Sequence, residues 1–206
     1  MDALRDALDR LARALLASHG ASARLSPFVP ACGGVLRGAF EVRSADGRVR
    51  RLQAAELTLP APLLRALAHA APVENLAIDL GTHTLTLWAP QELIELQVGH
   101  RWHGFSGRRM REWDERYVVF AEDGGDPVAL RTDEQEGPVW LSHRGEGRHD
   151  FFKAAPDLAS FYEALAIWLE AREPLGLEQA LSARFARGAS ELWIWKALVS
   201  GAESRR

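Results

Sequence analysis

Cysteine, lysine and long hydrophobic runs are nearly absent from the sequence. The single cysteine, Cys32, excludes an internal disulfide and favours a reducing compartment. No uncharged apolar run approaches the roughly 18 residues that a membrane span needs. The first residues, which include Asp2 and Asp6, lack the basic start of an export signal. We therefore expect a cytoplasmic protein that does not enter a membrane.

An excess of positive charge is also lacking. The 206 residues include 25 basic and 28 acidic side chains, and the formal net charge is −3. A domain that neutralises nucleic-acid phosphates usually carries a basic excess, so we expect no nucleic-acid partner. With 47% hydrophobic and 26% charged residues, the composition is that of a folded chain that needs no metal or disulfide to hold its core.

Motifs for catalysis or metal binding are missing as well. His100 and His103 stand three residues apart and His143 and His149 flank a turn, but neither paired cysteines nor a His-Glu-x-x-His helix accompanies them. No serine stands in a Gly-x-Ser-x-Gly elbow. The sequence predicts a non-enzymatic protein without metal or cofactor. The alternative is an enzyme or small-ligand protein whose site is assembled from distant residues in the fold.

Hydrophobic spacing predicts both helices and strands. An amphipathic helix is expected over residues 2–18, where leucines recur at helical spacing. Alternation at Phe40 and Val42, followed by Asp46-Gly47 and a second run at Val49 to Leu52, predicts a hairpin. Further strands are expected at 76–80, 84–88, 117–121, 127–131, 139–143 and around 151–152. The predicted fold is α+β, with a mostly antiparallel sheet through residues 76–153.

Prolines mark the expected starts of the later helices. Short helices should begin near Pro60 and Pro90, and a longer one near Pro156. Two more are expected at about 177–186 and 190–199, the second with Trp193 and Trp195. We predict one α+β domain over residues 1–170. A C-terminal helical extension, 171–206, would pack on this domain or form an interface.

The middle of the chain resembles a known family. The strings Trp88 to Leu93 and Gln97 to Arg101 are similar to the helix and turn of the SUKH superfamily, the group named for the yeast cell-wall assembly regulator and its bacterial homologues. Trp113 and Tyr117 before Val118 to Pro127, then Pro138 to His143, and then Ala154 to Phe161 resemble its next elements in order. The resemblance covers roughly residues 56–170.

This resemblance implies a sheet covered by helices and, for many bacterial members, an immunity protein that binds and neutralises a toxin. The expected function is therefore a protein-binding module. The alternative of another class is a regulatory scaffold subunit that uses the C-terminal helices.

Charge is distributed unevenly in the second half of the chain. Residues 100–116 hold five arginines against three acids. Residues 121–137 hold one arginine and six acids, which are the candidate partner-binding residues: Glu122, Asp123, Asp126, Asp133, Glu134 and Glu136. One interpretation is that these are solvated turns. The other is an acidic surface that speeds association with a basic partner such as a toxin.

Overall fold

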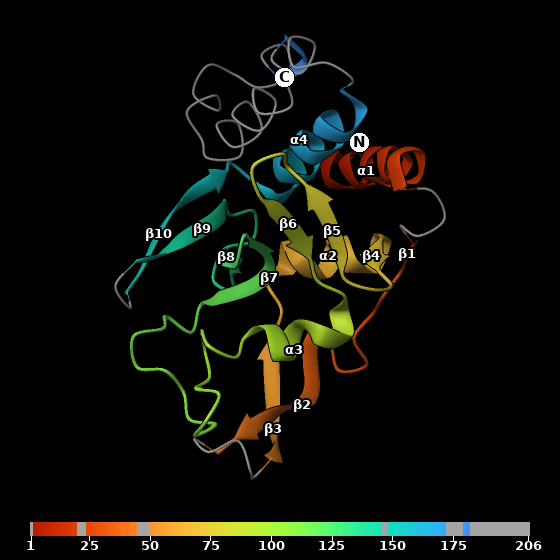
Figure 1. Ribbon diagram of the computed structural model, residues 1–206. Coiled ribbons are helices and arrows are strands. Elements are labelled where there is room, and N and C mark those ends of the chain that lie inside the picture. The colour runs from red at the N-terminus through yellow and green to blue at the C-terminus, as the bar shows by residue number, and fades with distance from the viewer. Residues whose placement is uncertain (1, 20–23, 45–49, 146–147, 172–178, 182–206) are drawn as a thin grey trace.

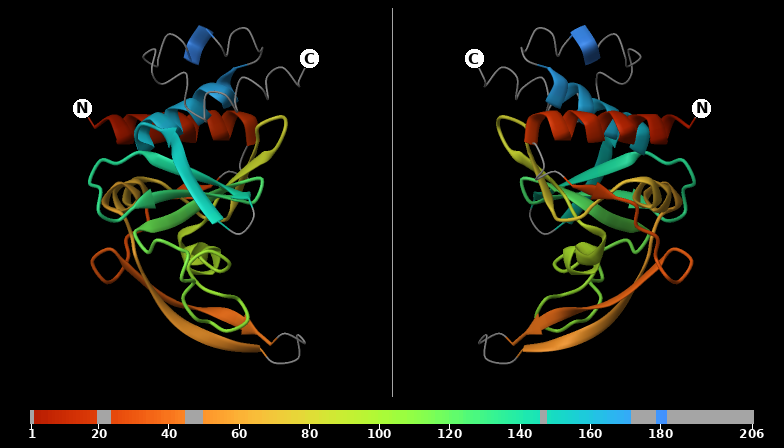
Figure 2. Two further views of the ribbon diagram at one scale, coloured as in Figure 1. Left: turned by 90° about the vertical axis from the view of Figure 1, so that its left-hand side faces the viewer. Right: turned by 90° about the vertical axis from the view of Figure 1, so that its right-hand side faces the viewer.

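The computed structural model describes residues 2–19, 24–44, 50–145, 148–171 and 179–181. Helices α1 (Ala3–His19) and α4 (Leu158–Glu170) lie side by side over one side of a central sheet. A β-hairpin projects from the opposite side of the sheet, so the molecule is elongated (Figures 1 and 2).

The central sheet is an antiparallel meander in which each strand pairs with its neighbours in sequence. Its strands are β5 (Leu76–Asp79), β6 (Thr84–Leu87), β7 (Tyr117–Asp123), β8 (Asp126–Arg131), β9 (Val139–Gly145) and β10 (Arg148–Ala155). Gly124 and Gly125 turn β7 into β8 with φ angles of 59° and 95°, which favour glycine. The predicted α+β fold with an antiparallel sheet is confirmed.

The helical layer closes the core on one side of this sheet. The buried residues of α1 include its four periodic leucines, Leu4, Leu8, Leu11 and Leu15. In α4, Phe161 meets Phe120 of β7 with ring centroids 5.7 Å apart. Arg10 of α1 also forms ion pairs with Glu163 and Glu170 of α4, at 3.3 and 2.6 Å. The predicted helices at both ends of this domain are thus part of one core.

Helix α2 (Ala61–His69) begins directly after Pro60, as predicted, and it is fixed to α1 by a 2.7 Å contact between His69 Nε2 and Asp9 Oδ1. Beside it, β1 (Leu25–Ser26) pairs with β4 (Ala71–Pro72) in a short two-stranded sheet. The sequence did not predict this pair, because two residues are too few to show an alternating pattern.

A side chain closes the edge of β7 where the neighbouring strand stops. Strand β6 pairs with β7 only at Ala121–Asp123. Gln97 lies beside the earlier part of β7, and its amide makes the two hydrogen bonds that a strand would make there. Its Nε2 donates to the carbonyl of Val119 at 2.8 Å, and its Oε1 accepts from the Val119 N–H at 3.1 Å. Gln97 is fully buried, so these bonds are shielded from water.

Gln97 follows a short helical segment that comes after β6 in the sequence and packs on the hairpin. This segment consists of η2 (Pro90–Glu92) and α3 (Leu93–Leu96). Two further side chains donate to the carbonyl of Tyr117 on the same edge: Trp113 through Nε1 at 3.2 Å and Arg101 through Nη2 at 3.3 Å. The segment from 97 to 113 therefore closes the β7 edge with side chains.

The projecting hairpin consists of β2 (Val35–Arg43) and β3 (Arg50–Thr58), which pair without a register shift. It confirms the predicted hairpin and is longer than expected; the turn residues 45–49 lie outside the described residues. A Cβ atom on Gly38 of β2 would stand 2.9 Å from Ile94 Cδ1, so glycine permits the close packing of α3 on the hairpin. The segment that resembles the SUKH superfamily, residues 56–170, begins inside β3.

Little of the predicted C-terminal extension is described. Residues 179–181 are helical, and Leu181 is fully buried in the main core. The remainder of the helices expected at 177–186 and 190–199, with Trp193 and Trp195, lies outside the described residues. Among the described helices, none is both long enough and apolar enough to cross a membrane.

We expect Gln97→Met to lower the free energy of unfolding by about 2–4 kcal/mol, because the buried N–H and carbonyl of Val119 would lose their partners. Gln91→Met is the matched control. Gln91 is exposed and makes one hydrogen bond to the Val73 carbonyl, so its loss should cost about 1 kcal/mol or less. Chemical denaturation measures both; equal losses would contradict the role of Gln97.

Candidate functional site

The structure separates the six predicted partner-binding acids into two groups. Glu122, Asp123 and Asp126 lie at the β7–β8 turn, whereas the other three follow the far end of β8. Strand β8 has six residues and is therefore about 17 Å long. The six acids therefore form two groups rather than one continuous surface, because consecutive loops of an antiparallel hairpin emerge at opposite ends of its strands.

Asp123 is not on the surface. Its side chain is 7% exposed, and its Oδ1 lies 2.9 Å from Nε2 of His83. Burial lowers the pKa of His83 below its ordinary value, and the charge of Asp79 opposes that shift. Asp123 is thus a buried partner of His83 rather than a residue that a docking protein would meet first.

The second acidic group is neutralised by arginines. Asp133 accepts hydrogen bonds from Nε and Nη2 of Arg131 at 2.9 and 2.7 Å, and it lies 3.4 Å from Arg116. Glu134 also lies 3.4 Å from Arg131. Glu136 pairs with Arg65 of α2. These contacts reduce the field that the acids present to a partner; that they bind one stays a prediction.

The structure reveals another candidate site, which we call the hairpin lobe: β2, β3 and residues 102–111. A groove of about 530 Å³ lies between the hairpin and residues 102–109. Phe40 of β2 and Trp102 line it and stack on each other with ring centroids 4.9 Å apart and an interplanar angle of 15°. Arg37, Glu56 and Arg109 also line it. It combines apolar and charged surface.

Two large apolar side chains of the lobe are exposed to solvent. Leu52 of β3 is 78% exposed, and Phe105 in the loop opposite is 60% exposed. Nη2 of Arg51 donates to the carbonyl of Ser106 at 3.2 Å and so holds that loop beside β3. Both side chains are therefore accessible to a partner protein.

The lobe is strongly basic although the whole chain has a net negative charge. Its described residues include two glutamates and seven exposed arginines: Arg37, Arg43, Arg50, Arg51, Arg108, Arg109 and Arg111. Arg37 pairs with Glu56, and Arg109 with Glu115 outside the lobe. Arg51, Arg108 and Arg111 have no carboxylate partner among the described residues. The lobe therefore offers uncompensated positive charge.

Sequence reasoning missed this site for a definable reason. The arginine excess at 100–116 was visible, but the arginines of β2 and β3 lie more than 50 residues earlier in the sequence. Pairing Arg43, Arg50 and Arg51 across the predicted hairpin would have shown that basic side chains gather at its far end. The groove itself depends on how α3 places the hairpin, which no local pattern reveals.

The histidines do not form a metal site among the described side chains. No three His, Cys, Asp or Glu side chains gather there as ligands would. His100 is buried, with its ring 5.3 Å from that of Trp113, while His103 is exposed and accepts a hydrogen bond from the Ser106 N–H. The side chains of His143 and His149 lie outside the described set.

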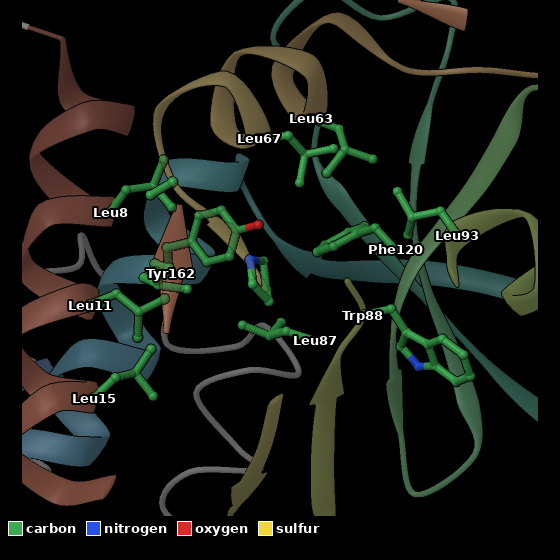
Figure 3. A pocket seen from close by; sticks show the side chains of 13 residues that line it. Leu8, Leu11, Leu15, Leu63, Leu67, Leu87, Trp88, Leu93, Phe120 and Tyr162 are labelled. Carbon is green, nitrogen blue, oxygen red and sulfur yellow. The ribbon is translucent and has the colours of Figure 1, made fainter. Parts of the chain in front are cut away.

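A narrow space in the main core is too small to be a ligand site. It lies between α1, α2 and β6, and its lining is mostly leucine (Figure 3). Its volume of about 20 Å³ has room for about one water molecule. Tyr162 of α4 directs its hydroxyl into this region (Figure 3), and burial raises its pKa. The space is a packing void.

Comparison with known proteins adds no assignment. No protein-family model, no curated protein and no solved structure matches this chain. The site must be interpreted from its own geometry.

A titration tests whether the second acidic group is neutralised internally. The hydrogen bonds from Arg131 lower the pKa of Asp133 to about 2, from 3.8. Since the pKa is lower in the folded state, this contact stabilises the fold above pH of about 4, and the contribution is lost as the pH falls toward 2. Carbon-detected NMR should give a titration midpoint of about 2 for the Asp133 carboxylate. Arg131→Gln should raise this midpoint, whereas Arg65→Gln, which removes the partner of Glu136, should not change it. A midpoint near 3.8 in the unmodified protein would exclude the proposed neutralisation.

Proposed function

We propose that this protein is a non-enzymatic binding module that holds a partner protein on its hairpin lobe. The observation that carries the proposal is a hairpin that projects from the main sheet and whose two strands have nine residues each. On the lobe that it forms, the side chains of Leu52 and Phe105 are largely exposed. Apolar side chains surrounded by arginine are the composition favoured at the centres of protein interfaces.

The SUKH resemblance supports one specific form of this function, an immunity protein that neutralises a toxin. Such a protein acts by occupying a surface of its target and needs no catalytic group of its own. The charge of the lobe changes the expected partner: a surface with seven exposed arginines attracts an acidic region, whereas the acidic segment 122–136 would attract a basic one.

A small-molecule site is the second candidate, because a volume of about 530 Å³ lies in the range of ligand pockets. The groove differs from such pockets in its open, solvated lining, since Arg37, Glu56 and Arg109 are all exposed. This favours a protein partner, whose own surface would complete the enclosure.

We expect the double variant Leu52→Asp and Phe105→Asp to weaken partner binding by roughly thirtyfold to a thousandfold, since buried interface anchors typically contribute about 1–2 kcal/mol each. The partner is isolated from source cells on the immobilised full chain, identified and purified, and its dissociation constant is measured by calorimetry. Both substituted residues are exposed, so thermal unfolding should change little.

The matched control is the triple variant Asp133→Asn, Glu134→Gln and Glu136→Gln, which should bind within about twofold of the unmodified chain, because internal ion pairs already satisfy these acids. If the control variant loses binding and the double variant keeps it, the acidic segment is the interface. Should the captured partner be a nucleic acid, the protein-binding proposal is wrong.

A further inference from the structure

The outer edge of β3 is a row of backbone groups with which no described strand pairs. The N–H of Leu59 donates to the carbonyl of Gly34 across the hairpin at 2.9 Å, so Leu59 and alternate residues before it face β2. The residues between them face away, because backbone direction alternates along a strand. These outward residues are Arg50, Leu52, Ala54, Glu56 and Thr58. Within the described chain, their outward N–H and carbonyl groups have no backbone partner.

The opposite edge of the hairpin is more occupied. On β2, the Arg43 N–H donates to the carbonyl of Gly104 at 3.1 Å, and the Val35 N–H donates to that of Cys32 at 3.1 Å. Strand β3 also lacks two of the features that protect sheet edges: it contains no proline, and its pairing has no bulge. An edge of this length without a proline or a bulge is suited to accept another strand whose charge complements its arginines.

The groove extends from β2 across the hairpin to this edge. Ala54 and Glu56 belong to the outward row and line the groove together with Gln53 and Ala55. A strand added to β3 would direct alternate side chains over the face of the hairpin that carries Gln53 and Ala55, beneath which the stacked rings of Phe40 and Trp102 are buried. Backbone pairing and a side-chain pocket would then act together, as they do in peptide recognition by strand addition.

Positive charge borders the edge on both faces. Arg50 lies in the outward row, and Arg51 and Arg109 lie toward the groove. The positive charge of Arg50 is only partly neutralised, because its Nε lies 3.7 Å from Oε1 of Glu41, which also pairs with Arg43. Among the described residues, Arg51 contacts a carbonyl and no carboxylate. An acidic strand would complement these charges, and a basic one would be repelled.

We infer that an extended acidic segment of a partner protein pairs with the outer edge of β3 and places apolar side chains in the groove beside it. This inference rests on the proposed function and specifies the mode of recognition and the chemistry of the partner.

The probe is a library of random 12-residue peptides displayed on phage and selected on the full chain. Enriched peptides should be rich in Asp and Glu, should carry apolar residues at alternate positions and should lack internal proline. Their dissociation constants should rise several-fold between low and physiological salt, because the attraction is between exposed charges.

The decisive variant is Ala54→Pro, which removes one outward N–H and no bond to β2; proline is tolerated at such edge positions. It should weaken the selected peptides at least tenfold. Ala39→Pro is the matched control, since Ala39 stands opposite Ala54 and faces outward from the β2 edge. It should leave binding within about twofold.

A second measurement uses the unmodified protein, so it remains informative even if the Ala54→Pro variant does not fold. Methylating the alternate backbone nitrogens of a selected peptide that face β3 should weaken binding at least tenfold, and methylating the other set should not.

Three results would overturn the inference: no enrichment of peptides, enrichment of basic peptides, or equal binding to both proline variants. Dimerisation of the chain that Ala54→Pro abolishes would also overturn it and assign the edge to a second copy. If any of these occurs while the captured partner still requires Leu52 and Phe105, the proposed function stands and only this mode of recognition fails.

Discussion

The fold depends on the way the side chain of Gln97 completes the edge of β7. With Val119 paired to this amide, the segment that follows α3 is fixed to the sheet, and Trp113 and Arg101 continue the same contact at Tyr117. Helix α3 in turn carries Ile94, which packs on Gly38 of β2. The position of the hairpin is therefore linked to a pair of buried hydrogen bonds that Gln97 makes 39 residues after β3 ends.

This arrangement gives the molecule two strand edges of opposite character. The β7 edge is buried and satisfied by side chains, so it contributes to stability and is inaccessible to other chains. The β3 edge is exposed, regular and bordered by arginines. Charge is divided in the same way: the basic side chains of the lobe are only partly compensated, whereas the acids after β8 are largely paired with Arg131, Arg116 and Arg65. The physical features of a recognition surface thus gather at the end of the molecule farthest from the helical layer (Figure 2).

Local signals predicted most of the secondary structure. Prolines mark the starts of α2 and η2, the double glycine turns β7 into β8, and leucine spacing identifies α1, because each of these effects acts within a few residues. The candidate site was harder to predict because side-chain partners are set by the tertiary fold. Asp123 meets His83 from another strand hairpin, and Glu136 meets Arg65 from a helix 71 residues earlier. The pairing of Arg131 with Asp133 spans only two residues, and this signal would have warned that the acidic segment is partly neutralised.

Amide hydrogen exchange of the free protein, resolved residue by residue, tests the contrast between the two edges most directly. We expect the N–H of Val119 to be as protected as those of the sheet interior. In β3 we expect alternation, with fast exchange at Leu52, Ala54 and Glu56 and slower exchange at Gln53, Ala55 and Leu57, which face β2. Uniform protection along β3 would show that its outer edge is already covered, and fast exchange at Val119 would show that Gln97 does not close the edge of β7; either result would contradict this account.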